Sequence, residues 1–210
     1  NYPRTEEADL ALLEEQGVDF VFAPAVDEIY PTPDTRVFDF GGLDRVMEGE
    51  HRPGHFNGVG QVVSRLFEIV RPNRAFFGEK DFQQLAIIRH MTAQLGLPIE
   101  IVGCPIVRDV DGLARSSRNT LLSPEHRAAA PRIYAVLAEA AESLRGKVSI
   151  PEAKRIIAQR IDAEPLLRTE YIEIASADSL QPAADWGQRL GELRCFAAVH
   201  AGPVRLIDNV

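Results

Sequence analysis

The sequence predicts an α/β fold built on a parallel sheet, followed by a smaller α+β lobe. Between residues 74 and 103 a strand, a helix and a second strand follow one another, which is the order of a βαβ unit with parallel strands. From residue 170 onwards the pattern predicts strands with no helix between them. The organisation therefore changes near residue 120, and neither a repeat nor a low-complexity linker marks the change.

Before the βαβ unit, the chain predicts one helix, one buried strand and a loop. A threonine cap and glutamates in the first turn predict a helix from about residue 6 to Gly17. The apolar run 18–23 (VDFVFA), closed by a proline, predicts a buried strand. Prolines and aspartates mark residues 27–36 as a loop, and residues 36–40 predict a short edge strand.

The remaining elements follow from apolar spacing and from the positions of proline and glycine. After a glycine-rich stretch at 49–60, apolar residues at steps of three and four up to residue 70 predict an amphipathic helix. The βαβ unit then comprises a strand at 74–77, a helix at 80–95 and a strand at 99–103. The later elements are an extended segment at 105–114 with a turn at Asp111-Gly112, an alanine-rich helix from Pro124 towards Arg145 with a break at Pro131, a helix beginning at Pro151, and strands at 170–175, 193–200 and 204–207.

Charge and composition exclude several classes of protein. The 210 residues include 31 Asp and Glu against 23 Lys and Arg, and this acidic balance excludes a general nucleic-acid binder, which would present a basic field. Cys104 and Cys195 have no CxxC spacing, which excludes a zinc cluster and a disulfide framework and fits a reducing cytoplasm. No apolar run reaches the roughly 18 residues of a membrane span, so no membrane partner is expected.

The first candidate cluster is FFGEKDFQQL at 76–85, where a strand turns into a helix. Gly78 favours a sharp turn, and the helix start offers N–H groups and partial positive charge to phosphate or ribose oxygens. Lys80 adds a cation, Asp81 can accept from ribose hydroxyls, and Gln84 lies one helical turn beyond Lys80. Ligands bind at the carboxyl ends of strands in open parallel sheets. An ordinary tight turn with solvated charges explains the same spacing equally well.

The second candidate cluster is RSSRN at 115–119. The hydroxyls of Ser116 and Ser117 and the planar donor fork of Arg118 are suited to hold a polyphosphate. Taken alone, the segment is better explained as a polar turn that caps the next helix. Its combination with the strand-end turn favours a nucleotidyl-transferring site, because such a site must hold the β- and γ-phosphates while the α-phosphorus is attacked.

A third cluster is HRPGHF at 51–56, in which Arg52 and His55 could contact an anionic substrate. A single histidine among glycines is more often a hydrogen-bonded loop residue than a catalyst, so the residues alone favour that reading. Asp9 is one of several carboxylates on a helix face, and by itself it is best explained as solvated. No histidine or cysteine stands at the spacing of zinc ligands.

Six motifs occur in order along the whole chain: YPRT (2–5), FAP…EIYP (22–31), EGxxRPGHFxGV (48–59), FGEKDFQQL (77–85), DGLARSSRN (111–119) and RLIDN (205–209). Together they resemble the pantothenate synthetases, the pantoate–β-alanine ligase family. The resemblance implies a Rossmann-like nucleotide domain, of which residues 1–118 would be the C-terminal part with the first strands missing, and an α+β lid domain at 119–210. It also implies a cytoplasmic homodimer that uses ATP and Mg²⁺.

The implied reaction condenses (R)-pantoate with β-alanine to pantothenate through a pantoyl adenylate, releasing pyrophosphate and AMP. By resemblance, nucleotide binding falls to Gly78, Glu79, Lys80, Asp81, Val107, Arg115, Ser116, Ser117 and Arg118, with Lys80, Ser116, Ser117 and Arg118 acting in catalysis. Pantoate would contact Gln84, Tyr2, Arg52 and His55, and Asp9 matches a carboxylate near the magnesium ion.

Two departures from the family pattern stand out. Position 115 is usually leucine or methionine, whereas this chain has Arg115 beside the proposed phosphate loop. The chain begins with Asn1, so the family's Met-Gly-x-x-His-x-Gly-His turn and its Asn-Pro-x-Gln-Phe stretch are not in it. We therefore expect a piece that lacks the family's N-terminal segment, is a weak or inactive catalyst alone, and exposes a sheet edge and apolar surface.

Two alternatives to the ligase remain at this stage. Another nucleotidyltransferase related to class I synthetases would share the architecture, but an acidic chain is poorly suited to bind tRNA. A non-catalytic nucleotide-binding α/β module would share the fold without the reaction. Competition for binding between pantoate and an amino acid distinguishes the ligase from the first alternative. Thermal stabilisation by ATP with magnesium distinguishes it from an inert module.

Overall fold

The computed structural model describes residues 6–187 and 193–210, and the chain divides into two units, Asn1–Arg36 and Val37–Val210. The boundary expected between residues 118 and 119 lies inside the second unit and stays a prediction. Thr5 and Tyr2 fall outside the described residues.

The first unit contains the expected helix but not the expected strand. Helix α1 covers Glu6–Glu15, and one further turn, α2, covers Val26–Ile29 and overlaps the start of the segment predicted to be a loop. The strand predicted at 18–23 is wrong, since these residues form no strand and Phe20 is 92% exposed. A strand needs a neighbour that completes its hydrogen bonds, and no described segment pairs with this one.

The α/β part of the second unit follows the predicted order. The structure gives α3 at Glu48–His51, α4 at His55–Val70, β1 at Arg74–Gly78, the 3₁₀ turn η1 at Glu79–Asp81, α5 at Phe82–Gln94 and β2 at Glu100–Cys104. Strands β1 and β2 are parallel, with Arg74 opposite Glu100 and Gly78 opposite Cys104, which confirms the βαβ unit. The core beside them is formed by Phe40, Phe56, Phe67, Ile87, Ile88 and Met91.

The short edge strand predicted at 36–40 is also wrong. The backbone N–H of Phe38 donates to Asn57 Oδ1 at 2.9 Å, so a side chain of α4 takes the place of a neighbouring strand. Phe40, only 1% exposed, anchors the segment in the core. The apolar spacing that suggested a strand therefore reflects burial against a helix.

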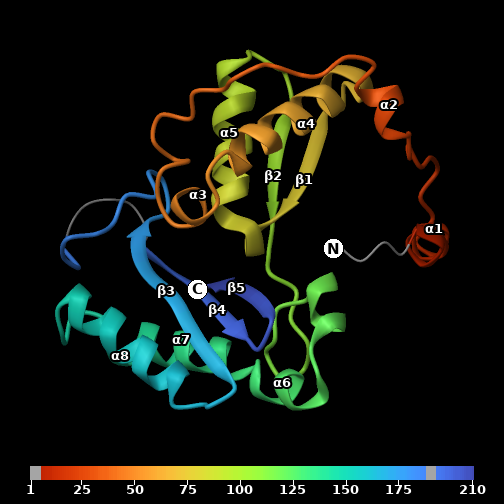
Figure 1. Cartoon of the computed structure of the whole chain (residues 1–210). Coiled ribbons are helices and arrows are strands. Elements are labelled where there is room, and N and C mark those ends of the chain that lie inside the picture. The colour runs from red at the N-terminus through yellow and green to blue at the C-terminus, as the bar shows by residue number, and fades with distance from the viewer. Residues whose placement is uncertain (1–5, 188–192) are drawn as a thin grey trace. The chain divides into compact units, whose positions relative to one another are not determined.

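The C-terminal part is α+β, as predicted (Figure 1). Arg108 and Ala114 pair across a hairpin whose turn contains Gly112 at φ 93°, a backbone conformation that favours glycine. The other elements are the 3₁₀ helix η2 at Ser117–Leu121, α6 at Pro124–Ala129, α7 at Arg132–Ser143, α8 at Ile150–Asp162, β3 at Leu167–Ser176, β4 at Leu193–Ala201 and β5 at Val204–Asn209. Strands β3, β4 and β5 form an antiparallel sheet in that order.

Local sequence signals explain the helix boundaries in this part. The predicted break at Pro131 is confirmed, because α6 ends before it and α7 begins after it. Ser149 caps α8 by accepting from the N–H of Glu152, and Pro151 occupies the second helical position. Helices α7 and α8 bury residues such as Leu137 against the sheet, which gives this part its own core.

Buried contacts within the second unit join its α/β part to the C-terminal sheet. Met47, which precedes α3, packs in one buried cluster with Leu180 and with Phe196 of β4. Asp208 of β5 accepts from Arg108 at 2.6 and 2.9 Å, which fixes the hairpin to the last strand. Within the part of the chain that is described, no helix has both the length and the apolar character needed to cross a bilayer.

Candidate active site

A pocket with about 440 Å³ of empty space, part of it open solvent, lies where the carboxyl end of β1 meets the C-terminal sheet. One side consists of η1 and the start of α5, and the other consists of β4, β5 and Tyr171 of β3. The side chains that line it include Glu48, Arg52, His55, Lys80, Asp81, Gln83, Gln84, Tyr171 and Asn209. The expected ligand position at a strand's carboxyl end is therefore hollow in this structure.

A second pocket, with about 340 Å³ of empty space that also includes open solvent, adjoins the first and shares Lys80, Ile207 and Asp208 with it. Ser116 and Arg118 line this second pocket together with Lys80. The two segments singled out as phosphate-binding candidates, which are far apart in sequence, are thus brought to one cavity. The two pockets therefore adjoin at Lys80.

Three polar side chains of η1 and α5 have no polar partner in the described part of the protein. Within the described residues, no side-chain hydrogen bond or ion pair is formed by Lys80, Asp81 or Gln84. Gly78 has a φ of −70° and an empty space around the position of a Cβ, so the turn itself does not require glycine. The absent side chain instead leaves room at the end of β1.

Glu79 differs from its neighbours in this turn. Its carboxylate lies 3.4 Å from Nη2 of Arg194, and Glu79 does not line either of the two pockets. Its assignment to nucleotide binding stays a prediction. The contact with Arg194 gives it a structural partner on β4.

The RSSRN segment combines a capping serine with an arginine that faces the cavity. Ser116 Oγ accepts from the backbone N–H of Arg118 at 3.3 Å and so caps η2. The alternative explanation of this segment, a polar turn that caps the next helix, therefore applies to Ser116. Ser117 does not line the second pocket, whereas the Arg118 side chain does, and the described residues give its guanidinium no hydrogen-bond partner.

Arg115 and Val107 lie outside both pockets. Arg115 is exposed and its Nε donates to Asp109 at 3.0 Å, while its backbone N–H donates to the carbonyl of Val107 at 2.9 Å. The unusual cation at position 115 is thus paired with an acid on the same hairpin. The nucleotide contacts of Val107 and Arg115 stay predictions.

Arg52 and His55 both line the first pocket, and their side chains contact each other at 3.0 Å. Burial lowers the pKa of His55, and the positive charges of Arg52 and Arg118 lower it further, against the opposing effect of Glu48 and Asp81. His55 is consequently neutral near pH 7.

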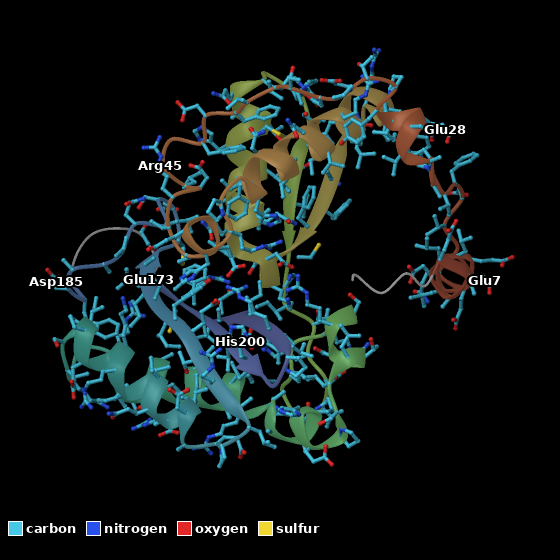
Figure 2. All side chains as sticks on the ribbon, in the orientation of Figure 1. Glu7, Glu28, Arg45, Glu173, Asp185 and His200 are labelled. Atoms are coloured by element: carbon cyan, nitrogen blue, oxygen red, sulfur yellow. The ribbon has the colours of Figure 1, made fainter. Side chains whose placement is uncertain are left out.

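The sequence analysis did not identify a buried cluster of ion pairs around Glu48. Glu48 is 8% exposed, and its carboxylate accepts from Arg205 at 2.6 and 2.8 Å and from the Tyr171 hydroxyl at 2.9 Å. Arg205 also donates to Glu170 at 2.7 Å, and His200 of β4, labelled in Figure 2, lies 3.7 Å from Glu170. Glu48 stands in a quoted motif, but its partners are more than a hundred residues away in sequence.

The cluster fixes the charge states of its members. Burial raises the pKa of Glu48, but hydrogen bonding and charge from Arg205, with help from Tyr171 and Arg52, hold it below its ordinary value. Burial and the adjacent Glu48 charge raise the pKa of Tyr171, so its hydroxyl stays protonated and donates. Glu48 is therefore an anion, and both of its carboxylate oxygens accept hydrogen bonds from side chains of the protein.

The two adjacent glutamines of the FGEKDFQQL motif have different surroundings. Gln83 is 5% exposed, and its side chain donates to the carbonyls of Leu43 and Val46 and accepts from the N–H of Glu48. Gln84 is half-buried and lines the pocket. The sequence singled out Gln84 but did not identify Gln83 as the residue that holds the loop before α3.

The predicted metal residue belongs to the first unit, whereas the pocket belongs to the second. Asp9 lies on α1 in the first unit and is exposed, and Tyr2 lies outside the described residues. In the described ranges, His, Cys, Asp and Glu form no group of three or more that could hold a metal ion. The assignment of Asp9 to magnesium stays a prediction.

Comparison with known proteins gives consistent results. The family model of pantoate-beta-alanine ligase matches residues 1–210. The pantothenate synthetase of Porphyromonas gingivalis is 52% identical over 209 residues, which cover 100% of this chain and 74% of the relative. The pantothenate synthetase of Phocaeicola vulgatus is 53% identical over 210 residues, with 100% and 74% covered.

Solved structures also resemble the chain over its whole length. The crystal structure of pantothenate synthetase from Thermus thermophilus has a TM-score of 0.92 and 47% identity, covering 100% of this chain and 75% of that one. A pantoate-beta-alanine ligase from Francisella tularensis, complexed with beta-gamma ATP and beta-alanine, has a TM-score of 0.77 and 28% identity, covering 100% and 70%. These similarities confirm the predicted fold class.

Proposed function

The chain belongs to the pantoate-beta-alanine ligase family, and we propose that the two adjoining pockets are where it joins pantoate to β-alanine with ATP. The ligation itself is the reaction of the family, and ATP is its nucleotide. The observation that carries the site assignment is that Lys80 and Arg118 line one pocket, while Gln84 and His55 line the pocket beside it.

The first step is attack on ATP by the carboxylate of pantoate. A bond forms between a carboxylate oxygen and the α-phosphorus, the bond from that phosphorus to the bridging oxygen breaks, and pyrophosphate leaves. Negative charge grows on the pyrophosphate, and the cations of Lys80 and Arg118, which line one pocket, would stabilise it. Ser116 and Ser117 would add donors from the same loop, although Ser116 already caps η2.

Pantoate would occupy the first pocket. Gln84 offers an amide for the pantoate hydroxyls and carboxylate, and Arg52 offers a cation. His55, being neutral, can exchange hydrogen bonds without adding charge. Asp81 and the open space at Gly78 would receive the ribose.

The second step uses β-alanine. Its amine attacks the acyl carbon of the pantoyl adenylate, the amide bond forms, AMP leaves, and the amine gives up a proton. A cavity closed on one side by the Glu48 cluster would help to keep water away from the reactive anhydride. Pantothenate and AMP are then released.

Magnesium fits this site as a companion of ATP. Mg²⁺ is usually held by one or two carboxylates together with substrate phosphates, so it requires no cluster of three protein ligands. Asp81 lines the pocket and has no ion-pair partner within the described residues, and Asp9 is the candidate suggested by resemblance. When bound, the ion would neutralise phosphate charge. The homodimer and the cytoplasmic location also remain predictions from the resemblance.

The reaction can be tested through its intermediate. The intact protein is incubated with ATP, magnesium and pantoate but no β-alanine, and transfer of labelled pyrophosphate into ATP is measured. We expect exchange that depends on pantoate, and formation of AMP and pantothenate once β-alanine is added. Exchange that depends on an amino acid instead would support the synthetase-like alternative. Products of ADP and phosphate would rule out the adenylate.

A further inference from the structure

The last residue of β5, Asn209, holds the turn that carries Lys80. Its side chain is 2% exposed, and Nδ2 donates to the carbonyl oxygens of Glu79 and Lys80, each at 3.0 Å. Both carbonyls belong to η1, the turn between β1 and α5. One amide of the C-terminal sheet thus binds two consecutive peptide groups of the α/β part.

Arg194 of β4 completes this attachment. Asn209 Oδ1 accepts from Arg194 Nη1 at 2.6 Å, and Arg194 Nη2 lies 3.4 Å from the Glu79 carboxylate. The Arg194 guanidinium also lies 4.2 Å from the ring centroid of Phe82, the first residue of α5. The Asn209 amide is therefore oriented, with its oxygen towards Arg194 and its nitrogen towards the turn.

We propose that Asn209 is a positioning residue, which places the Lys80 ammonium for the triphosphate without itself touching ATP. The inference rests on the proposed function, in which Lys80 binds phosphate. A carboxylate at position 209 could accept from Arg194 but could not donate to two carbonyl oxygens, so asparagine is chemically specific here. A small displacement of a catalytic group is costly because the transition state requires accurate placement.

The test is a double-mutant cycle on the intact protein. For Asn209→Ala and Asn209→Asp we expect kcat/KM for ATP to fall about 10-fold to 100-fold, with the KM for β-alanine within about twofold of the original. In a Lys80→Met background, the same substitutions at position 209 should change kcat/KM for ATP by less than about twofold, because the group they position is gone.

Trp186→Phe is a control for loss of stability alone. It deletes another hydrogen bond from a side chain to a backbone carbonyl, Trp186 Nε1 to Val148 at 2.6 Å, in the C-terminal part away from the two pockets. We expect it to lower the thermal midpoint without changing the KM for ATP. If the Asn209 variants only lower the midpoint as Trp186→Phe does, the positioning role is wrong.

The cycle also separates this inference from the proposed function. If the substitutions at position 209 lower kcat/KM for ATP by the same factor in the original protein and in the Lys80→Met background, the positioning role is wrong. The proposed ATP site would be unaffected by that result. Unchanged ATP kinetics in Lys80→Met itself would overturn the proposed role of Lys80. Loss that disappears in the Lys80→Met background supports both.

Discussion

The two sides of the pocket use polar side chains differently. On the side of η1 and α5, Lys80, Asp81 and Gln84 line the cavity, and the described residues give their side chains no partner. On the side of the C-terminal sheet, Tyr171 and Asn209 are committed to hydrogen bonds within the protein. Polar groups that are paired inside the protein shape the cavity, and groups without a partner are free to meet a ligand.

This contrast predicts which property each substitution changes. Removing a paired group leaves its partner buried and unsatisfied, so the free energy of unfolding falls. Removing an unpaired group costs the fold little, but it removes a contact with substrate or transition state. The comparison therefore fails if the unpaired side chains of Lys80, Asp81 and Gln84 prove to control stability, or if the paired side chains that line the pocket control only kinetics.

The largest effect on stability is expected from Arg205→Met. This change leaves Glu48 and Glu170 without their shared cation, and breaking a buried pair costs about 3–5 kcal/mol. Chemical denaturation followed by circular dichroism measures the loss. Arg155→Met, which removes an exposed pair with Glu152, is the control and should change stability little. Equal stability of the two variants would contradict the prediction.

Next in size is the effect of Lys80→Met on catalysis. Loss of one preorganised group at a transition state costs about 2.7–4 kcal/mol, so kcat/KM for ATP should fall at least about 100-fold while the thermal midpoint stays unchanged. Steady-state pyrophosphate release measures the rate. Lys147→Met removes the same charge from an exposed position outside the two pockets and should have no effect on this rate.

The adjacent glutamines provide a matched pair. Gln83→Ala leaves the Leu43 and Val46 carbonyls and the Glu48 N–H without their partner, at a cost of about 1–3 kcal/mol in unfolding free energy. Gln84→Ala should leave that free energy unchanged and raise the KM for pantoate. Measuring both properties for both variants sharpens the comparison, and a reversed pattern would refute it.

The smallest effect concerns pH and His55. Because the pKa of His55 is lower in the folded protein than in the unfolded chain, the unfolded state binds its proton first. His55 therefore lowers stability as pH falls through its unfolded pKa, near 6.5, towards its folded pKa. Denaturation at pH 7.5 and pH 5 should show a smaller loss for His55→Gln than for the original protein. Identical losses would contradict the lowered pKa.

The elements that the sequence predicted correctly are those specified by neighbouring residues. The break at Pro131, the cap and proline of α8, and the strand–helix–strand order at 74–103 all depend on local conformational preference. The strand predicted at 18–23 is wrong because an apolar run is necessary for a buried strand but does not supply a neighbour. Pairing is a property of the whole fold.

The same distinction applies to the site. Lys80, Gln84 and Arg118 could be singled out because their motifs place chemically apt groups at a strand end and in a loop. Asn209 and Arg205 could not be assigned, because their roles depend on partners more than a hundred residues away. Sequence motifs thus single out groups that are chemically suited to bind a ligand, whereas the buried groups that hold the surrounding backbone become visible only when the strands are placed.

The central claim is that Lys80 and Arg118 hold one triphosphate. It is tested most directly by calorimetric titration of ATP and of adenosine into the intact protein and into the Lys80→Met and Arg118→Met variants. The account predicts that each variant binds ATP at least about tenfold more weakly and binds adenosine with unchanged affinity. Unchanged ATP affinity in either variant, or an equal loss for adenosine, would contradict it.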